Sequence, residues 1–153
     1  MIDEAVRAVR ARTTCVPEIA IILGTGLGAL AEELDRRAAA HGGTVRALLQ
    51  VNVAGEAQKS GCAPAEAPGL ARGVAALPHL ALEGLMTIAP LTDDEAVQRR
   101  TFRGLRELRD ALKEDGLWLP TLSMGMSGDY GVAVEEGATV IRVGTALFGA
   151  RTA

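Results

Sequence analysis

Residues 18–43 read EIAIILGTGLGALAEELDRRAAAHGG, and this stretch contains one complete strand, turn and helix. Glu18–Leu23 is a short, nearly continuous apolar run that ends at a glycine, which is typical of a buried strand in a parallel sheet. Leu27–Ala40 then places its apolar residues at helical spacing, and two glycines end the helix. A buried strand followed by an amphipathic helix is the repeating unit of α/β folds.

The same alternation continues along the rest of the chain. Further strand-like runs lie at Val45–Val53, Leu82–Ile88, Leu117–Ser123 and Thr139–Val143. Helical segments are expected at residues 2–11, at Pro64–Ala75, at Thr92–Lys113 and at Asp129–Glu136, with a final turn near Thr145. The pattern predicts an α/β fold in which a parallel sheet of about five strands alternates with helices.

Local signals assign roles to individual side chains. The sequence Thr92-Asp93-Asp94-Glu95 predicts a capping box, with Thr92 as the N-cap and Glu95 reaching back to it. Phe102 and Trp118 are expected in the core, whereas Glu135 and Glu136 are expected on a solvated helix face.

The chain is too short for its sheet to close into a barrel. A closed (β/α)₈ barrel needs eight strands and about 250 residues, whereas this chain has 153 residues. We therefore expect residues 1–153 to form a single domain, either an open sheet or a partial (half) (β/α) barrel. Open sheet edges could be covered by another copy of the chain, which predicts a homo-oligomer.

Composition excludes several classes of partner. The net charge is −3 and aromatic residues make up 3% of the chain, so neither a basic surface nor stacking platforms for nucleic acid are expected. No apolar run approaches the roughly 20 residues of a membrane span. Cys15 and Cys62 fit neither a disulfide scaffold nor a metal site. These features predict a cytoplasmic protein without metal.

The first of three glycine-containing turns follows the strand at Glu18–Leu23. Its residues Gly24, Thr25 and Gly26 precede a helix, where free backbone amides could hold an anion. The spacing of the glycines does not match the dinucleotide fingerprint. A plain strand-to-helix turn explains the motif as well as a phosphate loop does.

The second turn, Ser123–Asp129, follows the fourth strand-like run. Ser123, Gly125 and Ser127 supply hydroxyl groups and exposed backbone before a helix, which together could form a cup for a phosphate dianion. The alternative is that Ser127 or Asp129 only caps that helix.

The third turn belongs to the last strand-like run. Arg142 lies in an otherwise apolar strand, where a desolvated guanidinium needs a partner, and a ligand atom is one candidate. Gly144 and Thr145 offer further backbone donors. Because the carboxyl ends of parallel strands meet at one edge, the second and third turns could surround one phosphate.

Catalytic constellations are scarce in this sequence. His41 and His79 have no nucleophile or carboxylate at motif spacing. Of the two lysines, Lys59 follows the second strand-like run near the carboxyl end of a strand, whereas Lys113 ends a charged helix. We therefore expect a binding protein rather than an enzyme.

From about Leu34 to Arg151 the chain resembles the C-terminal half of the pyridoxal-phosphate homeostasis protein family, whose fold is similar to the barrel of alanine racemase. The resemblance lies in LLQVNVAGEAQKSG, GLMTIAP, LSMGMSGD and IRVGTALFG, which begin at residues 48, 84, 122 and 141. It implies a protein that binds pyridoxal 5′-phosphate and buffers or delivers it without turnover. Because the Schiff-base lysine of that family has no counterpart here, any binding by this chain is expected to be noncovalent. The family's phosphate cup would fall on Ser123, Gly125, Ser127, Gly144 and Thr145, and Arg142 would face the pyridine nitrogen.

The chain departs from this family in its first part. The family's Schiff-base lysine belongs to an N-terminal half for which this sequence has no counterpart, and no lysine precedes Lys59. Residues 1–34 instead resemble the start of purine nucleoside phosphorylase, through VPEIAIILGTGLGAL at Val16–Leu30. That resemblance implies that Gly24, Thr25 and Gly26 contact phosphate. With two resemblances in one sequence, the chain looks like a fusion of two gene fragments.

Three functional hypotheses remain at this stage. The first is a non-catalytic protein that binds pyridoxal phosphate. The second is a folded chimera or oligomeric structural protein with no specific ligand. The third is a remnant phosphorylase loop that binds inorganic phosphate.

Overall fold

The computed structural model of the chain describes residues 20–23 and 27–149. Strands and helices alternate along this part of the chain in the order β1 (Ala20–Leu23), α2 (Leu27–Ala40), β2 (Val45–Gln50), α3 (Ala67–Ala75), β3 (Leu80–Met86), α4 (Glu95–Glu114), β4 (Thr121–Met126), α5 (Tyr130–Glu135), β5 (Val140–Arg142) and α6 (Thr145–Phe148). The predicted alternation of strand and helix is confirmed. The helix expected at residues 2–11 lies outside the described residues.

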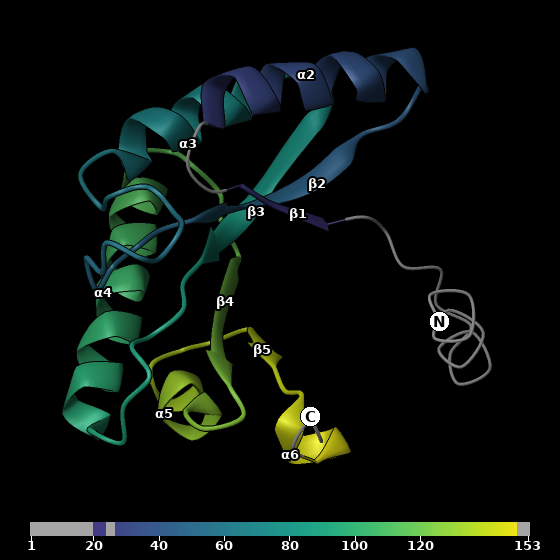
Figure 1. The fold of residues 1–153 in the computed structure, drawn as a ribbon. Coiled ribbons are helices and arrows are strands. Elements are labelled where there is room, and N and C mark those ends of the chain that lie inside the picture. Colours follow the sequence, from purple (N-terminus) through teal and green to yellow (C-terminus); the bar gives the residue numbers. More distant parts are fainter. Residues whose placement is uncertain (1–19, 24–26, 150–153) are drawn as a thin grey trace.

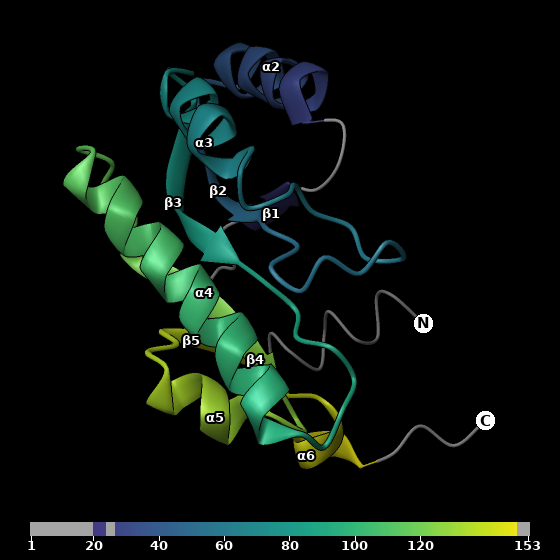
Figure 2. The same ribbon diagram turned by 90° about the vertical axis from the view of Figure 1, so that its left-hand side faces the viewer.

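The strands form a single parallel sheet in the order β1-β2-β3-β4-β5. Helices α2, α3, α4 and α5 lie along the outer side of this curved sheet (Figures 1 and 2). The order of the described strands is open, with β1 at one edge and β5 at the other.

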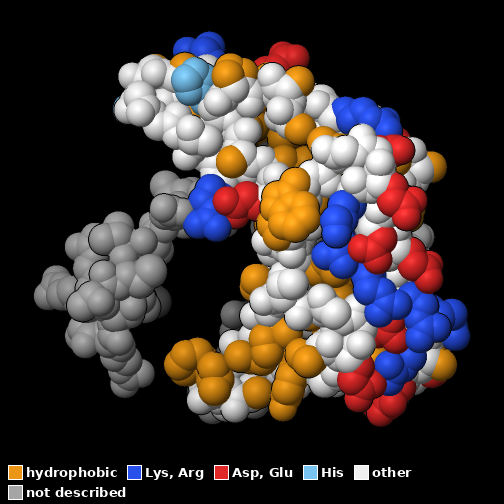
Figure 3. Space-filling model, turned by 180° about the vertical axis from the view of Figure 1, so that it is seen from behind, with side chains coloured by type: hydrophobic (Ala, Val, Ile, Leu, Met, Phe, Trp, Pro, Cys, Tyr) orange, Lys and Arg blue, Asp and Glu red, His pale blue; other side chains and the backbone are white. Residues whose placement is uncertain are grey.

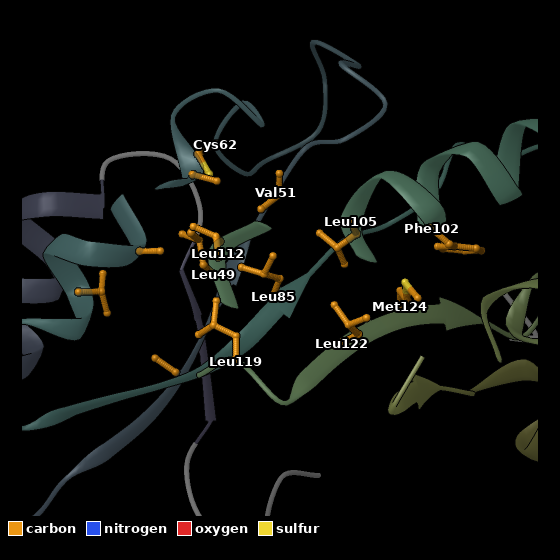
Figure 4. Close-up of a cluster of buried hydrophobic side chains, with 14 of the residues drawn as sticks. Leu49, Val51, Cys62, Leu85, Phe102, Leu105, Leu112, Leu119, Leu122 and Met124 are labelled. Atoms are coloured by element: carbon orange, nitrogen blue, oxygen red, sulfur yellow. The ribbon is translucent and has the colours of Figure 1, made fainter. Parts of the chain in front are cut away.

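A hydrophobic core fills the space between the sheet and its helices. Leu122 and Met124 of β4 point toward Phe102 and Leu105 of α4, and all four side chains are fully buried (Figure 4). Leu49 of β2 and other buried residues extend this layer toward α3. The predicted core position of Phe102 is confirmed.

Strands β3 and β4 approach closely at Gly84. A β-carbon at this position would lie 2.0 Å from the backbone oxygen of Thr121, so only glycine fits. The sequence predicted a strand at Leu82–Ile88 but gave no reason for a glycine within it; the close approach of Thr121 supplies that reason.

The fourth strand begins later than predicted. The expected range was Leu117–Ser123, but β4 spans Thr121–Met126. Trp118 is 70% exposed instead of buried, and it lies beneath the ammonium group of Lys113. Pro120 explains the shift, because proline has no backbone N–H for a sheet.

The start of α4 also differs from the prediction. Its N-cap is Asp94 and not Thr92, since the Asp94 side chain accepts a hydrogen bond from the Ala96 backbone N–H at 2.8 Å. Thr92 instead accepts from the Asp94 N–H through its hydroxyl at 3.1 Å. Asp is a stronger N-cap than Thr, which favours the observed start.

The predicted solvated face at Glu135 and Glu136 is wrong for Glu136. That side chain is 3% exposed and forms ion pairs with Arg99, Arg103 and Arg106 of α4. Hydrogen bonds from Arg103 and Arg99 hold the pKa of the Glu136 carboxyl below its ordinary value. This cluster joins α5 to α4.

None of the helices between residues 27 and 149 is both long enough and apolar enough to span a lipid bilayer.

Candidate functional site

A cleft of about 760 Å³ opens at the carboxyl ends of the strands. Most of its lining residues belong to the segments that follow β2, β3, β4 and β5, namely Lys59, residues 88–93, residues 126–129, and Gly144, Thr145, Phe148 and Gly149. Gln98 of α4 completes the lining. Ligand sites of parallel α/β proteins lie at this edge, and this volume is in the usual range for small-molecule pockets.

The loop after β4 is fastened to the start of α6 at the cleft. The Ser127 hydroxyl oxygen accepts hydrogen bonds from the backbone amides of Gly144 and Ala146, at 3.1 and 3.2 Å. Two amides therefore point at a single oxygen atom. Asp129 shapes the same loop by accepting from the Met126 amide at 2.6 Å.

Arg142 connects three neighbouring strands just behind this loop. Its guanidinium donates to the Ser123 hydroxyl oxygen at 2.6 Å and to the Thr87 carbonyl oxygen at 3.0 Å. The Thr87 hydroxyl donates in turn to the Val51 carbonyl at 2.8 Å. A chain of hydrogen bonds thus crosses from β5 to the end of β2.

The partners of Arg142 in this chain of hydrogen bonds are neutral. Within residues 20–23 and 27–149, no carboxylate is within ion-pair distance of the guanidinium, and burial lowers its pKa. The predicted need of Arg142 for a partner is met within the chain, by Ser123 and Thr87, rather than by a ligand atom, which was one candidate. The Asp129 carboxylate, which is not within ion-pair distance, still favours the charged form of Arg142.

Gly125 has a structural role in this region. Its φ angle is +95°, and a β-carbon would lie 2.6 Å from the Ala133 β-carbon of α5. The register of β4 and β5 shifts between Ser123 and Met126, where this glycine lies. The close approach of α5 therefore explains the glycine without any ligand.

Lys59 reaches the same cleft from the loop after β2. Its ammonium group donates to the Ala89 carbonyl at 2.7 Å and to the Ile88 carbonyl at 3.4 Å, and it forms an ion pair with Glu56. The Asn52 side chain holds this loop through the Glu56 backbone. Lys59 is thus fixed at the cleft wall by acceptors from its own chain.

The structure brings some of the predicted site residues together and separates others. Ser127, Gly144 and Thr145 line the cleft. Ser123, which is 2% exposed, and Arg142 do not line it but bond to each other. The predicted anion loop at Gly24, Thr25 and Gly26 lies outside the described residues.

Sequence reasoning missed two parts of this site. Thr87 is fully buried and links Arg142 to Val51, and a polar residue inside an apolar run was the signal for it. The segment after β3 forms much of the cleft wall, including the fully exposed Leu91. The motif GLMTIAP and the predicted capping box overlap this segment, but neither indicated that it would line a cleft.

Chemically, the cleft offers hydrogen-bond donors and apolar surface. Backbone amides and the hydroxyl groups of Ser127 and Thr145 can bind an anion, while Ile88, Met126 and Phe148 can contact a ring. Over the described residues, no cluster of His, Cys, Asp and Glu side chains suits a metal ion.

Comparison with known proteins identifies the family to which this chain belongs. Residues 21–152 match the family described as "Alanine racemase, N-terminal domain". The pyridoxal phosphate homeostasis protein of Pseudomonas aeruginosa is 51% identical over 122 residues, which cover 80% of this chain and 52% of the relative. The chain spans about half the length of the curated relatives it matches.

Solved structures agree with this assignment. PipY of Synechococcus elongatus, solved with PLP bound, is 34% identical, with a TM-score of 0.75, over 97% of this chain and 79% of PipY. Alanine racemase of Corynebacterium glutamicum shares the fold, with a TM-score of 0.68 and 18% identity over 88% of this chain and 37% of the racemase.

The family match also bears on the first part of the chain. Because the match begins at residue 21, it includes nearly all of β1 and all of α2, whereas the expected phosphorylase-like segment extends to residue 34, within α2. These relatives do not show the resemblance to purine nucleoside phosphorylase. On the extent of the match and the shared fold, this chain belongs to the alanine racemase N-terminal domain family.

Proposed function

We propose that this chain binds pyridoxal 5′-phosphate noncovalently in the cleft at the carboxyl ends of its strands, as a non-catalytic protein of pyridoxal-phosphate homeostasis. The observation that carries the proposal is the pair of backbone amides, from Gly144 and Ala146, that point at one oxygen atom. A phosphate oxygen in the place of the Ser127 hydroxyl oxygen would accept from the same two donors.

The residues around this point fit a phosphorylated ring. Once a phosphate oxygen accepts from the two amides in its place, the Ser127 hydroxyl can donate to a further phosphate oxygen, as can the Thr145 hydroxyl. Arg142 adds a positive charge behind them. Met126 and Phe148 supply apolar surface for a pyridine ring. The relatives named for pyridoxal phosphate homeostasis, and PipY with PLP bound, support the same ligand.

We place the phosphate cup at Ser127, Gly144 and Thr145, with Ser123, Gly125 and Arg142 as its supporting layer. Arg142 holds the ends of β3, β4 and β5 together through the Ser123 hydroxyl and the Thr87 carbonyl. Gly125 lets α5 pack closely beneath the loop. When bound, the cofactor would supply an aldehyde that can form imines with amines, whereas the residues of this cup only bind and orient it.

The carbonyl and carboxylate partners of Lys59 support noncovalent binding. An amine that already donates to Ala89 and Ile88 and pairs with Glu56 must break these contacts before it can attack an aldehyde. We therefore expect borohydride treatment of the complex to leave Lys59 unmodified beyond the level found at the exposed Lys113. A selective reduced adduct at Lys59 would contradict noncovalent binding.

A titration followed by absorbance and intrinsic fluorescence tests the cup. We expect the double variant Ser127→Ala/Thr145→Val to raise the Kd for pyridoxal phosphate at least about tenfold, because hydrogen bonds to a charged group contribute about 1.5–3 kcal/mol each. The matched control is Thr44→Val/Ser60→Ala, which removes the same two hydroxyl types at exposed positions outside the cleft.

Two results would contradict the proposal. One is wild-type protein that shows no saturable binding up to about millimolar ligand, an affinity of only about 4 kcal/mol. The other is a cleft variant that binds as tightly as the control variant does.

A further inference from the structure

The loop that carries Ser127 leads directly into helix α5. Ser127 lies three residues before the start of this helix at Tyr130, and α5 has only six residues. Isolated helices shorter than about 12 residues are marginal in water, so the position of α5 depends on its contacts with the rest of the fold. The contacts that hold α5 therefore also help to place Ser127.

Two kinds of contact hold α5. On one side, Val132 and Ala133 are part of the hydrophobic core, and Ala133 lies directly against Gly125 of β4. On the other side, Glu136, the C-cap residue of α5, forms ion pairs with α4. The apolar contacts press the helix onto the sheet, whereas the ion pairs act on its C-terminal end.

The ion pairs of Glu136 involve both carboxylate oxygens. Oε1 is 2.9 Å from Arg103 Nη2 and 3.1 Å from Arg99 Nη1, and Oε2 is 3.1 Å from Arg106 Nη1. Arg106 also donates to the Glu136 backbone carbonyl at 3.3 Å. Figure 3 shows basic and acidic side chains intermixed on the side of the molecule that carries α4. Because charge-assisted bonds reach both oxygens and the backbone, they fix the end of α5 in direction as well as in distance.

Phosphate binding would remove another contact that holds the Ser127 loop. In the structure, the Ser127 hydroxyl oxygen accepts from the Gly144 and Ala146 amides, which ties the loop to α6. In the proposed complex a phosphate oxygen accepts from these two amides, so the loop loses its direct bonds to α6. The position of Ser127 in the complex then depends more on α5 than it does in the free protein.

We propose that Glu136 is a positioning residue of the phosphate cup, which holds the Ser127 loop in place through α5; this inference rests on the proposed function. Glu136 does not line the cleft, so it acts on the ligand only through the geometry of the cup. The adjacent Glu135 offers a matched comparison, because it also pairs with Arg99 but is 64% exposed.

The NMR amide resonances of Gly144 and Ala146 test the positioning without ligand. Ser127→Ala removes the acceptor of both amides and defines their chemical shifts in the unbonded state. We expect Glu136→Gln to move both resonances toward those shifts, because a displaced loop weakens the two hydrogen bonds. Glu135→Gln should leave them at their wild-type values. Resonances that Glu136→Gln leaves unchanged would overturn the proposal.

A titration with pyridoxal phosphate measures the consequence for binding. We expect Glu136→Gln to raise the Kd at least about threefold and Glu135→Gln to leave it unchanged. Val74→Ala is the control for stability, because it shortens a buried side chain of α3 outside the cleft and should not change the Kd. If Val74→Ala raised the Kd as much as Glu136→Gln does, a general loss of stability would explain both, and the proposal would be overturned.

The two measurements distinguish this inference from the proposed function. Wild-type protein that does not bind pyridoxal phosphate contradicts the proposed function, while the Gly144 and Ala146 resonances still report whether Glu136 places the loop. Wild-type binding together with an unchanged Kd in Glu136→Gln leaves the proposed function standing and removes the role of Glu136.

Discussion

The close contact at Gly84 makes this residue one of the least replaceable in the sheet. We expect Gly84→Ala to destabilise the protein by about 3 kcal/mol or more, because its β-carbon would overlap the Thr121 backbone oxygen. Gly73→Ala is the matched control, since a β-carbon there meets nothing within 4 Å inside α3. Alanine should raise stability at this helical site by about 0.5–1 kcal/mol. Urea unfolding measures both, and a Gly84→Ala protein as stable as wild type would refute the close contact.

The buried Glu136 carboxylate makes stability depend on pH. Its pKa in the folded protein lies below the ordinary value of 4.5, chiefly because Arg103 donates to it. A lowered folded-state pKa contributes stability above the unfolded-state pKa, and this contribution is lost as the pH falls through the folded-state value. We therefore expect the free energy of unfolding to fall below about pH 4.5, and Glu136→Gln to lose less over this range than wild type.

At neutral pH the same substitution should cost about 1–3 kcal/mol through weakened hydrogen bonds to charged groups. The partners Arg99 and Arg103 are a third to a half exposed, which keeps this cost below that of a deeply buried ion pair. Glu135→Gln is the control, because that side chain is 64% exposed and its pair with Arg99 should contribute little. Equal costs for the two substitutions in urea unfolding would contradict the role of Glu136.

Helix α4 is the longest element, and its first turn depends on a single cap. Asp94→Ala should destabilise the protein by about 0.5–2 kcal/mol, because the Ala96 amide would lose its acceptor. Asp93→Ala is the control, since the adjacent Asp93 is not the N-cap. The difference in urea midpoint between the two variants measures the cap, and a larger loss for Asp93→Ala would place the start of the helix elsewhere.

For the whole molecule, ligand binding in the cleft should appear as added stability. At about 100 times its Kd, a ligand that binds only the folded state adds about 2.7 kcal/mol, which corresponds to a Tm increase of about 5–10 °C for a chain of this size. We expect this increase with pyridoxal phosphate for wild type and for Thr44→Val/Ser60→Ala. At the same ligand concentration, Ser127→Ala/Thr145→Val should gain less. Equal increases for all three proteins would indicate binding outside the cleft.

The strand and helix pattern of the chain could be predicted from its sequence. The strand-like run at Val45–Val53 and the helical spacing at Leu27–Ala40 are local signals, because burial on a sheet or a helix face repeats with a fixed period. The first residues of β4 and α4 were predicted less accurately, because neighbouring residues compete for the same role, as at Pro120 and between Thr92 and Asp94. There the outcome depended on which residue could donate or accept a backbone hydrogen bond.

The order of motifs at strand ends also predicted that the Ser127 and Gly144 segments would meet, because parallel strands bring their carboxyl ends to one edge. The partners of individual polar groups depended on the tertiary structure. Only the fold placed Ser123 against Arg142, Glu136 among three arginines of α4, and Ser127 against two amides. These contacts join residues far apart in the chain, and hydrogen bonds depend on ångström-scale distances and directions that a one-dimensional pattern of residue types does not contain.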